Sequence, residues 1–359
     1  MSDGARFVRP SLDQLTSGDP AEPFAAGAAS LGLNEGLSGP FPSALSALER
    51  VLPGLGRYPN RGSYELVAAL AARHGVQPKQ VFVAAGADAV IGYVCQAVLE
   101  RGDEIVTAWP SFPSFVRDPQ KRDAIPITVP LANNHVHLAA MRAAVTSRTR
   151  LVFLATPNNP TGLATPRDDV IAFVRDLPEH VLPVIDEAYF DYLAPAGRLD
   201  SIEDLVRAGQ DVLVLRSFSK LYGLAGLRIG YGVGPADVVG AMRKVQRGYD
   251  VSAPAQVAAL ASLDDSAEVE RRRAANSAAI AALTAVLRAR GLEPLSGSVT
   301  NFVLVEVGAD ADEVAAALLR EGVAVQSGTP FGAPTALRIG AGSSADLALL
   351  DAGLAAVLT

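Results

Sequence analysis

The chain has 359 residues, of which 49% are hydrophobic and 19% are charged, and its formal net charge is −7. This length allows one large and one smaller domain, each with a buried core, and the composition is typical of soluble globular proteins. The negative net charge, without a stripe of basic residues, argues against a nucleic-acid-binding surface, because such surfaces are built from clustered Lys and Arg.

Two further features concern location. The amino-terminal sequence has no charged region followed by an apolar signal segment, and no uninterrupted apolar stretch reaches membrane-spanning length. The single cysteine, Cys95, excludes an intrachain disulfide and is expected to fill the core. We therefore predict a cytoplasmic protein that does not enter a membrane.

In chain order, residues 1–40 are rich in Gly, Pro and Ser and predict an irregular amino-terminal arm. From 41 to 250, apolar runs of strand length alternate with helix-like segments. This alternation predicts a large α/β domain with a mostly parallel seven-stranded sheet that is covered on both faces. The predicted strands are 81–85, 103–108, 125–129, 150–155, 181–185, 212–216 and 228–233.

The pattern changes after residue 250. A long Ala-rich stretch at 255–291 predicts helix. Short strand-like runs then alternate with two helix-like segments, the runs at 302–307, 323–326 and 336–340 and the helices at 311–320 and 344–357. Residues 251–359 are therefore predicted to form a smaller α+β domain.

Lys220 is one of only four lysines, and it lies in the segment Ser217-Phe218-Ser219-Lys220 directly after a predicted strand. Arg228 follows eight residues later. An amine flanked by hydroxyls and backed by a fixed cation is what a cofactor aldehyde that carries a phosphate needs for attachment and neutralisation. The segment therefore predicts a pyridoxal phosphate anchor at Lys220, whereas the other three lysines are more simply solvated surface charges.

Other strand ends carry matching groups. Asp186 ends the predicted strand 181–185, and a carboxylate there would keep a pyridine nitrogen protonated, which makes the ring a strong electron sink. Tyr189 and Asn159 could hydrogen-bond the ring oxygen, and Phe112 offers a flat face for stacking. The alternatives are that Asp186 caps the next helix and that Asn159 belongs to a plain turn.

The turn at 85–88 joins a predicted strand to a predicted helix. The main-chain amides of Ala87 and Asp88 would make a phosphate cradle there, helped by the helix dipole. Any strand-to-helix turn of small residues would look similar. The turn predicts a phosphate site only in combination with Lys220 and Arg228.

Taken together, these segments resemble the class I and II aminotransferases of the pyridoxal phosphate type I fold, and most closely the histidinol-phosphate aminotransferase branch. The resemblance implies a transaminase that acts as a homodimer on a small-molecule amino donor and a keto acceptor. The matching segments span about residues 31 to 342 and are 33–35, 57–59, 86–88, 157–162, 186–189, 217–220, 226–230, 301–302 and 337–339.

The resemblance also implies a role for each matching residue. Lys220 would hold the cofactor and shuttle a proton, Asp186 would pair the pyridine nitrogen, and Arg338 would bind the carboxylate of the amino donor. Asn159, which also faces the substrate, and Tyr189 would hold the ring oxygen. The phosphate would be bound by Ser217, Ser219, Arg228, the amides of Ala87 and Asp88, and Tyr58 of the neighbouring subunit.

Three features depart from the pattern of this branch, and one is the turn 84–89, which reads Ala-Ala-Gly-Ala-Asp-Ala in place of Gly-Asn-Gly-Ser-Asp-Glu. Gln326 stands where an arginine usually helps to bind the substrate phosphate, and Gly36 replaces the usual Asn. We predict transfer between glutamate or 2-oxoglutarate and a histidinol-phosphate-like or aromatic substrate, with an aromatic amino acid aminotransferase as the alternative. A pyridoxal phosphate-dependent decarboxylase of an amino acid phosphate and a non-catalytic ligand sensor are more distant alternatives.

Two other patterns carry no site. The segment 340–345 matches the dinucleotide-binding fingerprint, but neither a strand nor an acidic residue follows at the required spacing. His135 and His137 have the spacing of two ligands on one strand face without a third ligand. We predict neither nicotinamide nor metal binding.

Overall fold

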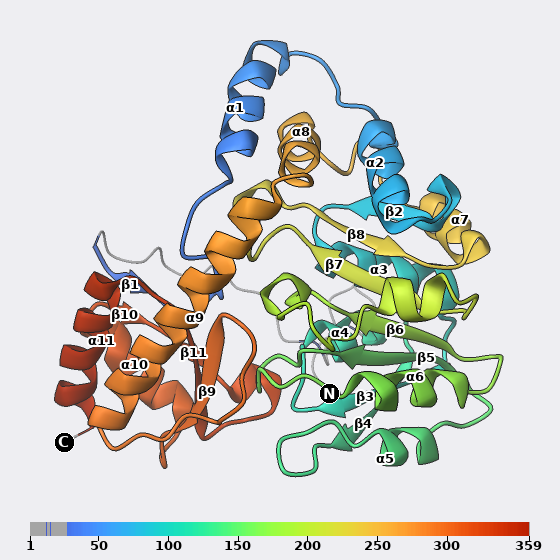
Figure 1. The fold of residues 1–359 in the computed structure, drawn as a ribbon. Coiled ribbons are helices and arrows are strands. Elements are labelled where there is room, and N and C mark those ends of the chain that lie inside the picture. The colour runs from blue at the N-terminus through green and yellow to red at the C-terminus, as the bar shows by residue number, and fades with distance from the viewer. Residues whose placement is uncertain (1–11, 13–14, 16–26, 359) are drawn as a thin grey trace, which may run out of the picture.

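The computed structural model describes residues 12, 15 and 27–358. Most of the predicted arm 1–40 therefore lies outside the described residues. Three sheets are present within them: one of seven strands, one of three and one of two. Figure 1 shows the seven-stranded sheet with its helices beside a smaller group formed by the carboxyl-terminal part of the chain.

The seven-stranded sheet contains each of the seven strands predicted from the apolar runs. Its order is β2-β8-β7-β6-β5-β3-β4, and the pairs β7-β6, β6-β5, β5-β3 and β3-β4 are parallel, whereas β8 runs antiparallel to both neighbours. The strands are β2 (Val81–Ala84), β3 (Glu104–Trp109), β4 (Ile125–Pro130), β5 (Thr149–Ala155), β6 (Leu182–Asp186), β7 (Leu213–Ser217) and β8 (Gly230–Val233).

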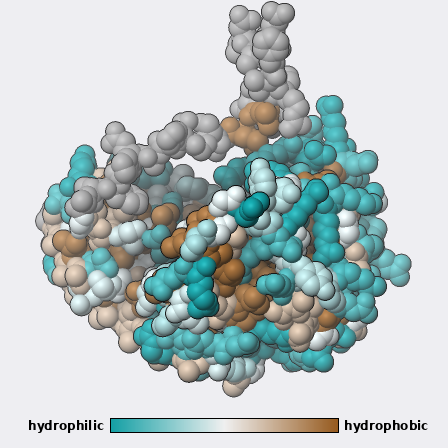
Figure 2. Space-filling model, turned by 90° about the horizontal axis from the view of Figure 1, so that it is seen from above, coloured by the Kyte–Doolittle hydropathy of each residue, from teal (hydrophilic) through white to brown (hydrophobic). Residues whose placement is uncertain are grey.

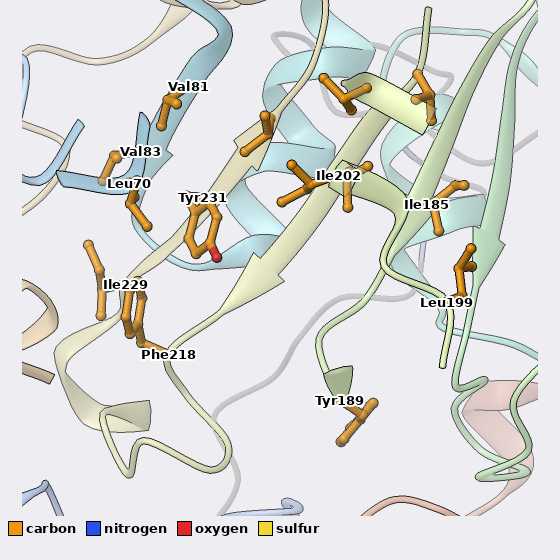
Figure 3. Packing of buried hydrophobic residues seen from close by; sticks show 14 of the residues in the cluster. Leu70, Val81, Val83, Ile185, Tyr189, Leu199, Ile202, Phe218, Ile229 and Tyr231 are labelled. Carbon is orange, nitrogen blue, oxygen red and sulfur yellow. The ribbon is translucent and has the colours of Figure 1, made fainter. Parts of the chain in front are cut away.

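Helices cover both faces of this sheet, because alternate residues of each strand point to opposite sides. Val152 and Leu154 of β5 join one core, together with residues of α1, α2, α6 and α8, part of which is seen in Figure 3. Leu151 and Phe153 join the other core, with α3, α4 and α7. The helices are α1 (Pro42–Val51), α2 (Tyr64–His74), α3 (Ala87–Val98), α4 (Ser114–Gln120), α5 (Leu138–Ala143), α6 (Arg167–Arg175), α7 (Ala236–Val245) and α8 (Ala253–Ser262).

The carboxyl-terminal part has its own core, which includes Leu283, Val303, Leu318 and Leu350. It contains α9 (Ser266–Ala289), β9 (Phe302–Glu306), α10 (Ala311–Arg320), β10 (Val323–Ala324), β11 (Gln326–Ser327), β12 (Ala336–Gly340) and α11 (Ser344–Val357). The sheet β11-β12-β9 is antiparallel. The domain limits at 40 and 250 stay a prediction.

Three elements differ from the prediction. The helical stretch 255–291 is interrupted after α8, and α9 begins anew with Asp265, whose side chain accepts a hydrogen bond from the Glu268 amide. The predicted strand 323–326 is two short strands with different partners, because β10 pairs with β1 (Ala29–Ser30) and β11 with β12. The arm thus contributes β1 to the smaller group.

Several short helical turns connect these elements. Three of them are used below: η4 (Phe190–Tyr192) follows β6, η6 (Ala225–Leu227) precedes β8, and η7 (Thr329–Phe331) lies between β11 and β12. A short π-helix spans Ile202–Val206. Within the described part of the chain, no helix is both long and apolar enough to cross a bilayer.

Candidate active site

A cavity of about 440 Å³ lies at one edge of the seven-stranded sheet. Strands β2, β5, β6 and β7 end at this edge, and β8 begins there because it is antiparallel, so that Gly230 lies opposite both Ser217 and Ala84. Ligands bind at this carboxyl edge in open α/β sheets. The cavity lining includes most of the predicted site residues: Ala87, Asp88, Phe112, Asn159, Asp186, Tyr189, Ser217, Ser219, Lys220, Arg228 and Arg338.

Lys220 follows β7 and extends into this cavity. Its Nζ donates a hydrogen bond to the main-chain oxygen of Leu33 over 3.2 Å. Desolvation, together with the positive charges of Arg338 and Arg228, lowers the pKa of the amine to about 8. With this pKa, roughly a tenth of Lys220 is uncharged at pH 7, and the uncharged amine is the form that attacks an aldehyde.

This low pKa predicts the pH dependence of Lys220 reactivity. The rate at which the cofactor-free protein captures pyridoxal should rise with pH and reach half its maximum near pH 8, because only the neutral amine reacts. Arg338→Gln should move the midpoint upward, because it removes a nearby positive charge. Arg290→Gln removes a positive charge at the end of α9, away from the cavity, and should leave the midpoint unchanged. Measurement of capture rates by absorbance tests this, and a midpoint near the ordinary lysine value of 10.5 would contradict it.

Asp186 ends β6 and is 7% exposed. One carboxylate oxygen, Oδ1, accepts a hydrogen bond from the Ala188 amide at 2.9 Å, and desolvation raises the pKa of the carboxyl to about 6. The next helical turn, η4, has no side-chain cap. Among the described residues no cation is bonded to the buried Asp186 carboxylate, which faces the cavity. A protonated pyridine nitrogen would complete this environment.

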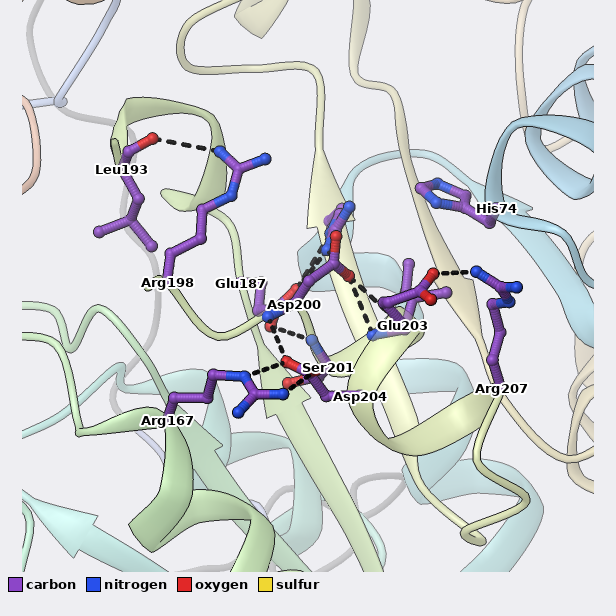
Figure 4. A network of polar contacts seen from close by, with 12 residues as sticks. His74, Arg167, Glu187, Leu193, Arg198, Asp200, Ser201, Glu203, Asp204 and Arg207 are labelled. Carbon is purple, nitrogen blue, oxygen red and sulfur yellow. Dashed lines mark hydrogen bonds and ion pairs between the residues drawn. The ribbon is translucent and has the colours of Figure 1, made fainter. Parts of the chain in front are cut away.

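The neighbouring acid has a different place. Glu187 accepts two hydrogen bonds from Arg216, from Nε at 3.0 Å and Nη2 at 2.8 Å, and a third from the Ser201 amide. Arg216 also contacts Asp200 at 2.7 Å. Figure 4 shows Glu187, Asp200 and Ser201 in this network. The Asp186 carboxylate is bonded instead to the Ala188 amide. Successive side chains of a strand point to opposite faces. Asp186 therefore faces the cavity, whereas Glu187 forms the ion pair with Arg216.

The end of the cavity that is predicted to bind the phosphate is shaped by two glycines. Gly86 precedes α3 with a φ of +97°, and a Cβ on it would lie 2.8 Å from Nη2 of Arg228. A Cβ on Gly230 would lie 2.5 Å from the Ala87 amide nitrogen. The absence of side chains lets Arg228, the α3 amides and the hydroxyls of Ser217 and Ser219 share one space, which fits a bound phosphate.

Arg338 of β12 is 5% exposed. It donates to the Gly32 oxygen at 2.6 Å and to Oδ1 of Asn159 at 2.8 Å, and its guanidinium lies 4.6 Å from the ring centre of Phe331. Its Nε has no hydrogen-bond partner among the described residues. A buried guanidinium held by neutral acceptors favours an anionic ligand, because burial of an unpaired charge is costly.

Asn159 and Tyr189 are both buried beside this group. Since the amide oxygen of Asn159 is engaged by Arg338, its nitrogen is the group that a ligand oxygen would meet. The hydroxyl oxygen of Tyr189 accepts a hydrogen bond from Nδ2 of Asn34 at 3.0 Å. The hydroxyl hydrogen of Tyr189 is therefore still available as a donor. Both residues can make the predicted hydrogen bond to a ring oxygen.

Two predicted site residues lie outside the cavity lining. Tyr58 is 82% exposed and stacks on Tyr249 with a ring-centre distance of 4.6 Å. Gln326 of β11 is half-buried, donates to the Ser327 oxygen at 3.0 Å and lies opposite Arg338 in the strand register. The roles of both residues stay predictions.

Some residues of the cavity were not among the predicted site residues. Leu33, Asn34 and Glu35 line it from the arm, and Phe331 lines it from η7. Asn34 has a φ of +53°, and its main-chain oxygen accepts from Asn301. The segment 33–35 matched the family pattern, so a signal existed for the arm.

Comparisons with known proteins identify the family. The model of the family "Aminotransferase class I and II" matches residues 28–356. This chain belongs to the class I and II aminotransferases. A histidinol-phosphate aminotransferase of Moorella thermoacetica is 39% identical over 87% of this chain and 81% of its own length, and an aromatic amino acid aminotransferase of Mycobacterium tuberculosis is 42% identical over 84% and 85%.

Solved structures agree with this assignment. The histidinol-phosphate aminotransferase of Sinorhizobium meliloti, in complex with pyridoxal 5'-phosphate, covers 99% of this aminotransferase with a TM-score of 0.89 and 31% identity, and 98% of that structure is covered. An aspartate aminotransferase of Thermus thermophilus covers 92% with a TM-score of 0.83 and 27% identity, and 92% of it is covered. The chain has the type I fold of this family, whose cofactor is pyridoxal phosphate.

Proposed function

We propose that this aminotransferase exchanges amino groups between glutamate or 2-oxoglutarate and amino acids that have an aromatic side chain. The observation that carries the proposal is Arg338, a buried guanidinium at the cavity whose partners are neutral acceptors. Such a group recognises a carboxylate by a bidentate contact. Phe112, Phe331 and Leu33 also line the cavity, and apolar walls suit an aromatic side chain.

The residues of the cavity divide the chemistry among them. Pyridoxal phosphate, when bound, supplies an electron sink for the pair of electrons left at the substrate's α-carbon. Asp186 would hold a proton at the pyridine nitrogen, and Asn159 and Tyr189 would orient the ring through its oxygen. Arg228, Ser217, Ser219 and the amides of Ala87 and Asp88 would bind the phosphate. Nζ of Lys220 would hold the cofactor through its aldehyde carbon and, once the substrate's amino group has taken its place, would accept the proton of the substrate's α-carbon.

A second candidate substrate is histidinol phosphate. It is supported by the 39% identity to the histidinol-phosphate aminotransferase of Moorella thermoacetica. It is disfavoured by Gln326, which replaces a cation that usually helps to bind the substrate phosphate, since charge-assisted hydrogen bonds are about twice as strong as neutral ones. Histidinol phosphate also lacks the carboxylate for which Arg338 is suited.

The proposal predicts a donor-dependent effect of Arg338→Gln. With phenylalanine or tyrosine, kcat/KM should fall by about tenfold or more, because a charge-assisted hydrogen bond to the carboxylate is lost. With histidinol phosphate it should change little. Single-turnover absorbance measurements with glutamate, phenylalanine, tyrosine and histidinol phosphate as separate donors test this.

Matched variants and products sharpen that experiment. Gln326→Arg should improve turnover of histidinol phosphate without improving that of phenylalanine. Preferential turnover of histidinol phosphate by the unaltered protein, with no response to Arg338→Gln, would overturn the aromatic assignment. Release of carbon dioxide from a single substrate would instead indicate a decarboxylase.

We further propose a homodimer. Tyr58 is exposed beside Tyr249, as a residue that reaches a neighbouring subunit would be, and Leu45, Leu52 and Leu55 are each more than 40% exposed on α1 and the turn that follows it. Figure 2, viewed from the side of α1 and α8, shows hydrophobic residues gathered on this face. Such a surface is typical of subunit interfaces, and sedimentation in solution would test it. A cytoplasmic location stays a prediction from the sequence.

A further inference from the structure

Asp250 lies in the connection between α7 and α8, outside the cavity lining, and its side chain is only 1% exposed. Its carboxylate accepts three hydrogen bonds. Oδ2 accepts from the Ala85 amide at 3.1 Å, and Oδ1 accepts from the Tyr93 hydroxyl at 2.9 Å and from Nη2 of Arg247 at 3.2 Å. None of these contacts is explained by the chemistry of the cavity itself.

The partners of Asp250 lie on both sides of the phosphate-binding turn. Ala85 is the residue between the end of β2 and Gly86, and Tyr93 is on α3, whose first residues are Ala87 and Asp88. One carboxylate therefore joins the strand side of the turn to the body of the helix that supplies the phosphate-binding amides. The turn itself depends on Gly86 at a φ of +97°, and glycine gives the backbone the greatest freedom to move.

Binding of an anion by main-chain amides requires that they are held in place before the anion arrives, because reorganisation would reduce the gain. A hydrogen bond from an amide to a carboxylate is about twice as strong as a neutral one. The Ala85 amide is adjacent to Gly86, the residue with the greatest backbone freedom in the turn. Its hydrogen bond to Asp250 therefore restricts the backbone at the point where the turn can move most.

We propose that Asp250 is a positioning residue for the cofactor phosphate: it holds the turn 85–88 so that the amides of Ala87 and Asp88 meet the phosphate. The proposal rests on the proposed function, because it assigns the phosphate of pyridoxal phosphate to this turn. Asp250 acts through the main chain and does not touch the ligand.

The test compares pyridoxal phosphate with pyridoxal, which lacks the phosphate. Asp250→Ala should weaken equilibrium binding of pyridoxal phosphate about tenfold, the order expected for loss of a charge-assisted hydrogen bond, and should leave binding of pyridoxal within about twofold. Asp250→Asn keeps an oxygen that accepts from the Ala85 amide, so it should recover most of the affinity. Both ligands are followed by absorbance, independently of turnover.

Asp103→Ala is the matched control. Its carboxylate also accepts from a main-chain amide, Glu100 at 2.8 Å, and from an arginine, Nε of Arg150 at 3.4 Å. However, it precedes β3 and so lies at the opposite edge of the sheet from the cavity. This variant should lose similar stability while its affinity for pyridoxal phosphate stays unchanged.

The outcomes separate the inference from the proposed function. If the unaltered protein binds pyridoxal phosphate no more tightly than pyridoxal, the proposed phosphate site itself is wrong. If it prefers pyridoxal phosphate and Asp250→Ala retains that preference, Asp250 has no positioning role. If Asp250→Ala does not fold, Tyr93→Phe carries the test, because it removes one donor to the same carboxylate; about threefold weaker binding of pyridoxal phosphate alone is expected, and equal binding would overturn the proposal.

Discussion

Replacing Lys220 with alanine is expected to reduce transamination by at least about 10³-fold, because one side chain supplies both covalent attachment and proton transfer. No other lysine lines the cavity in the part of the chain that the structure describes. The protein should still bind pyridoxal phosphate through its phosphate, but without the absorbance band of a lysine-bound cofactor. Absorbance spectra and single-turnover rates with phenylalanine measure both effects.

Lys244→Ala is the control for this variant, since Lys244 is exposed on α7. It should leave the spectrum and the rate unchanged. Persistence of the lysine-bound band in Lys220→Ala, or its loss in Lys244→Ala, would show that the attachment site has been assigned to the wrong residue.

Asp186→Asn is expected to have opposite effects on activity and stability. The amide cannot hold a proton at the pyridine nitrogen as a carboxylate does, so kcat should fall by at least about a hundredfold, the order found when one preorganised electrostatic partner is removed. The cofactor-free protein should become more stable at pH 7.5. Turnover and urea unfolding of the same variant measure the two effects.

The stability effect follows from the pKa of Asp186, which burial raises from 3.8 to about 6. Between these two pH values the folded carboxyl keeps a proton that the unfolded one has lost, so the protein loses stability as pH rises through this window. The loss is fully present above pH 6 and corresponds to roughly 3 kcal/mol at most. Asparagine avoids it, so the gain at pH 7.5 should be about 1 to 3 kcal/mol and should shrink towards pH 4.

The adjacent acid provides the contrast. Glu187→Gln should destabilise the protein, because Glu187 is bonded to the buried Arg216 and its removal leaves that charge less compensated. If Asp186→Asn were instead less stable than the unaltered protein at pH 7.5, as is expected for Glu187→Gln, the Asp186 carboxylate would have a partner that stabilises the fold. It would then not be a group left free to meet a ligand in the cavity.

Much of this architecture could be predicted because its signals are local. Buried strands are continuous apolar runs, and each of the seven strands of the large sheet lies where such a run was predicted, including the antiparallel β8 and the partly exposed edge strand β4. The common location of two candidate site residues could also be predicted, because parallel strands end at one edge: Asp186 and Lys220 follow two such runs, and the structure brings both to the same cavity.

Strand direction and strand pairing, which depend on residues far apart in the sequence, could not be predicted in this way. The antiparallel direction of β8, the pairing of β1 with β10 and the division of 323–326 between two sheets all depend on which strand lies alongside. Nothing in the local pattern of a strand specifies its neighbour, since either neighbour satisfies the same backbone groups.

The same distinction runs through the site. The sequence by itself singled out Lys220, Asp186 and Arg228 as candidate site residues, because a lysine, an acid and an arginine at strand ends have few other reasons to occur together, and all three line the cavity. Only the tertiary structure decided that Asn34 holds the Tyr189 hydroxyl from 155 positions away and that Asp250 holds the Ala85 amide from 165. These contacts arise when the chain closes on itself, and hydrogen-bonding groups as common as an asparagine amide or an aspartate carboxylate do not reveal their partners beforehand.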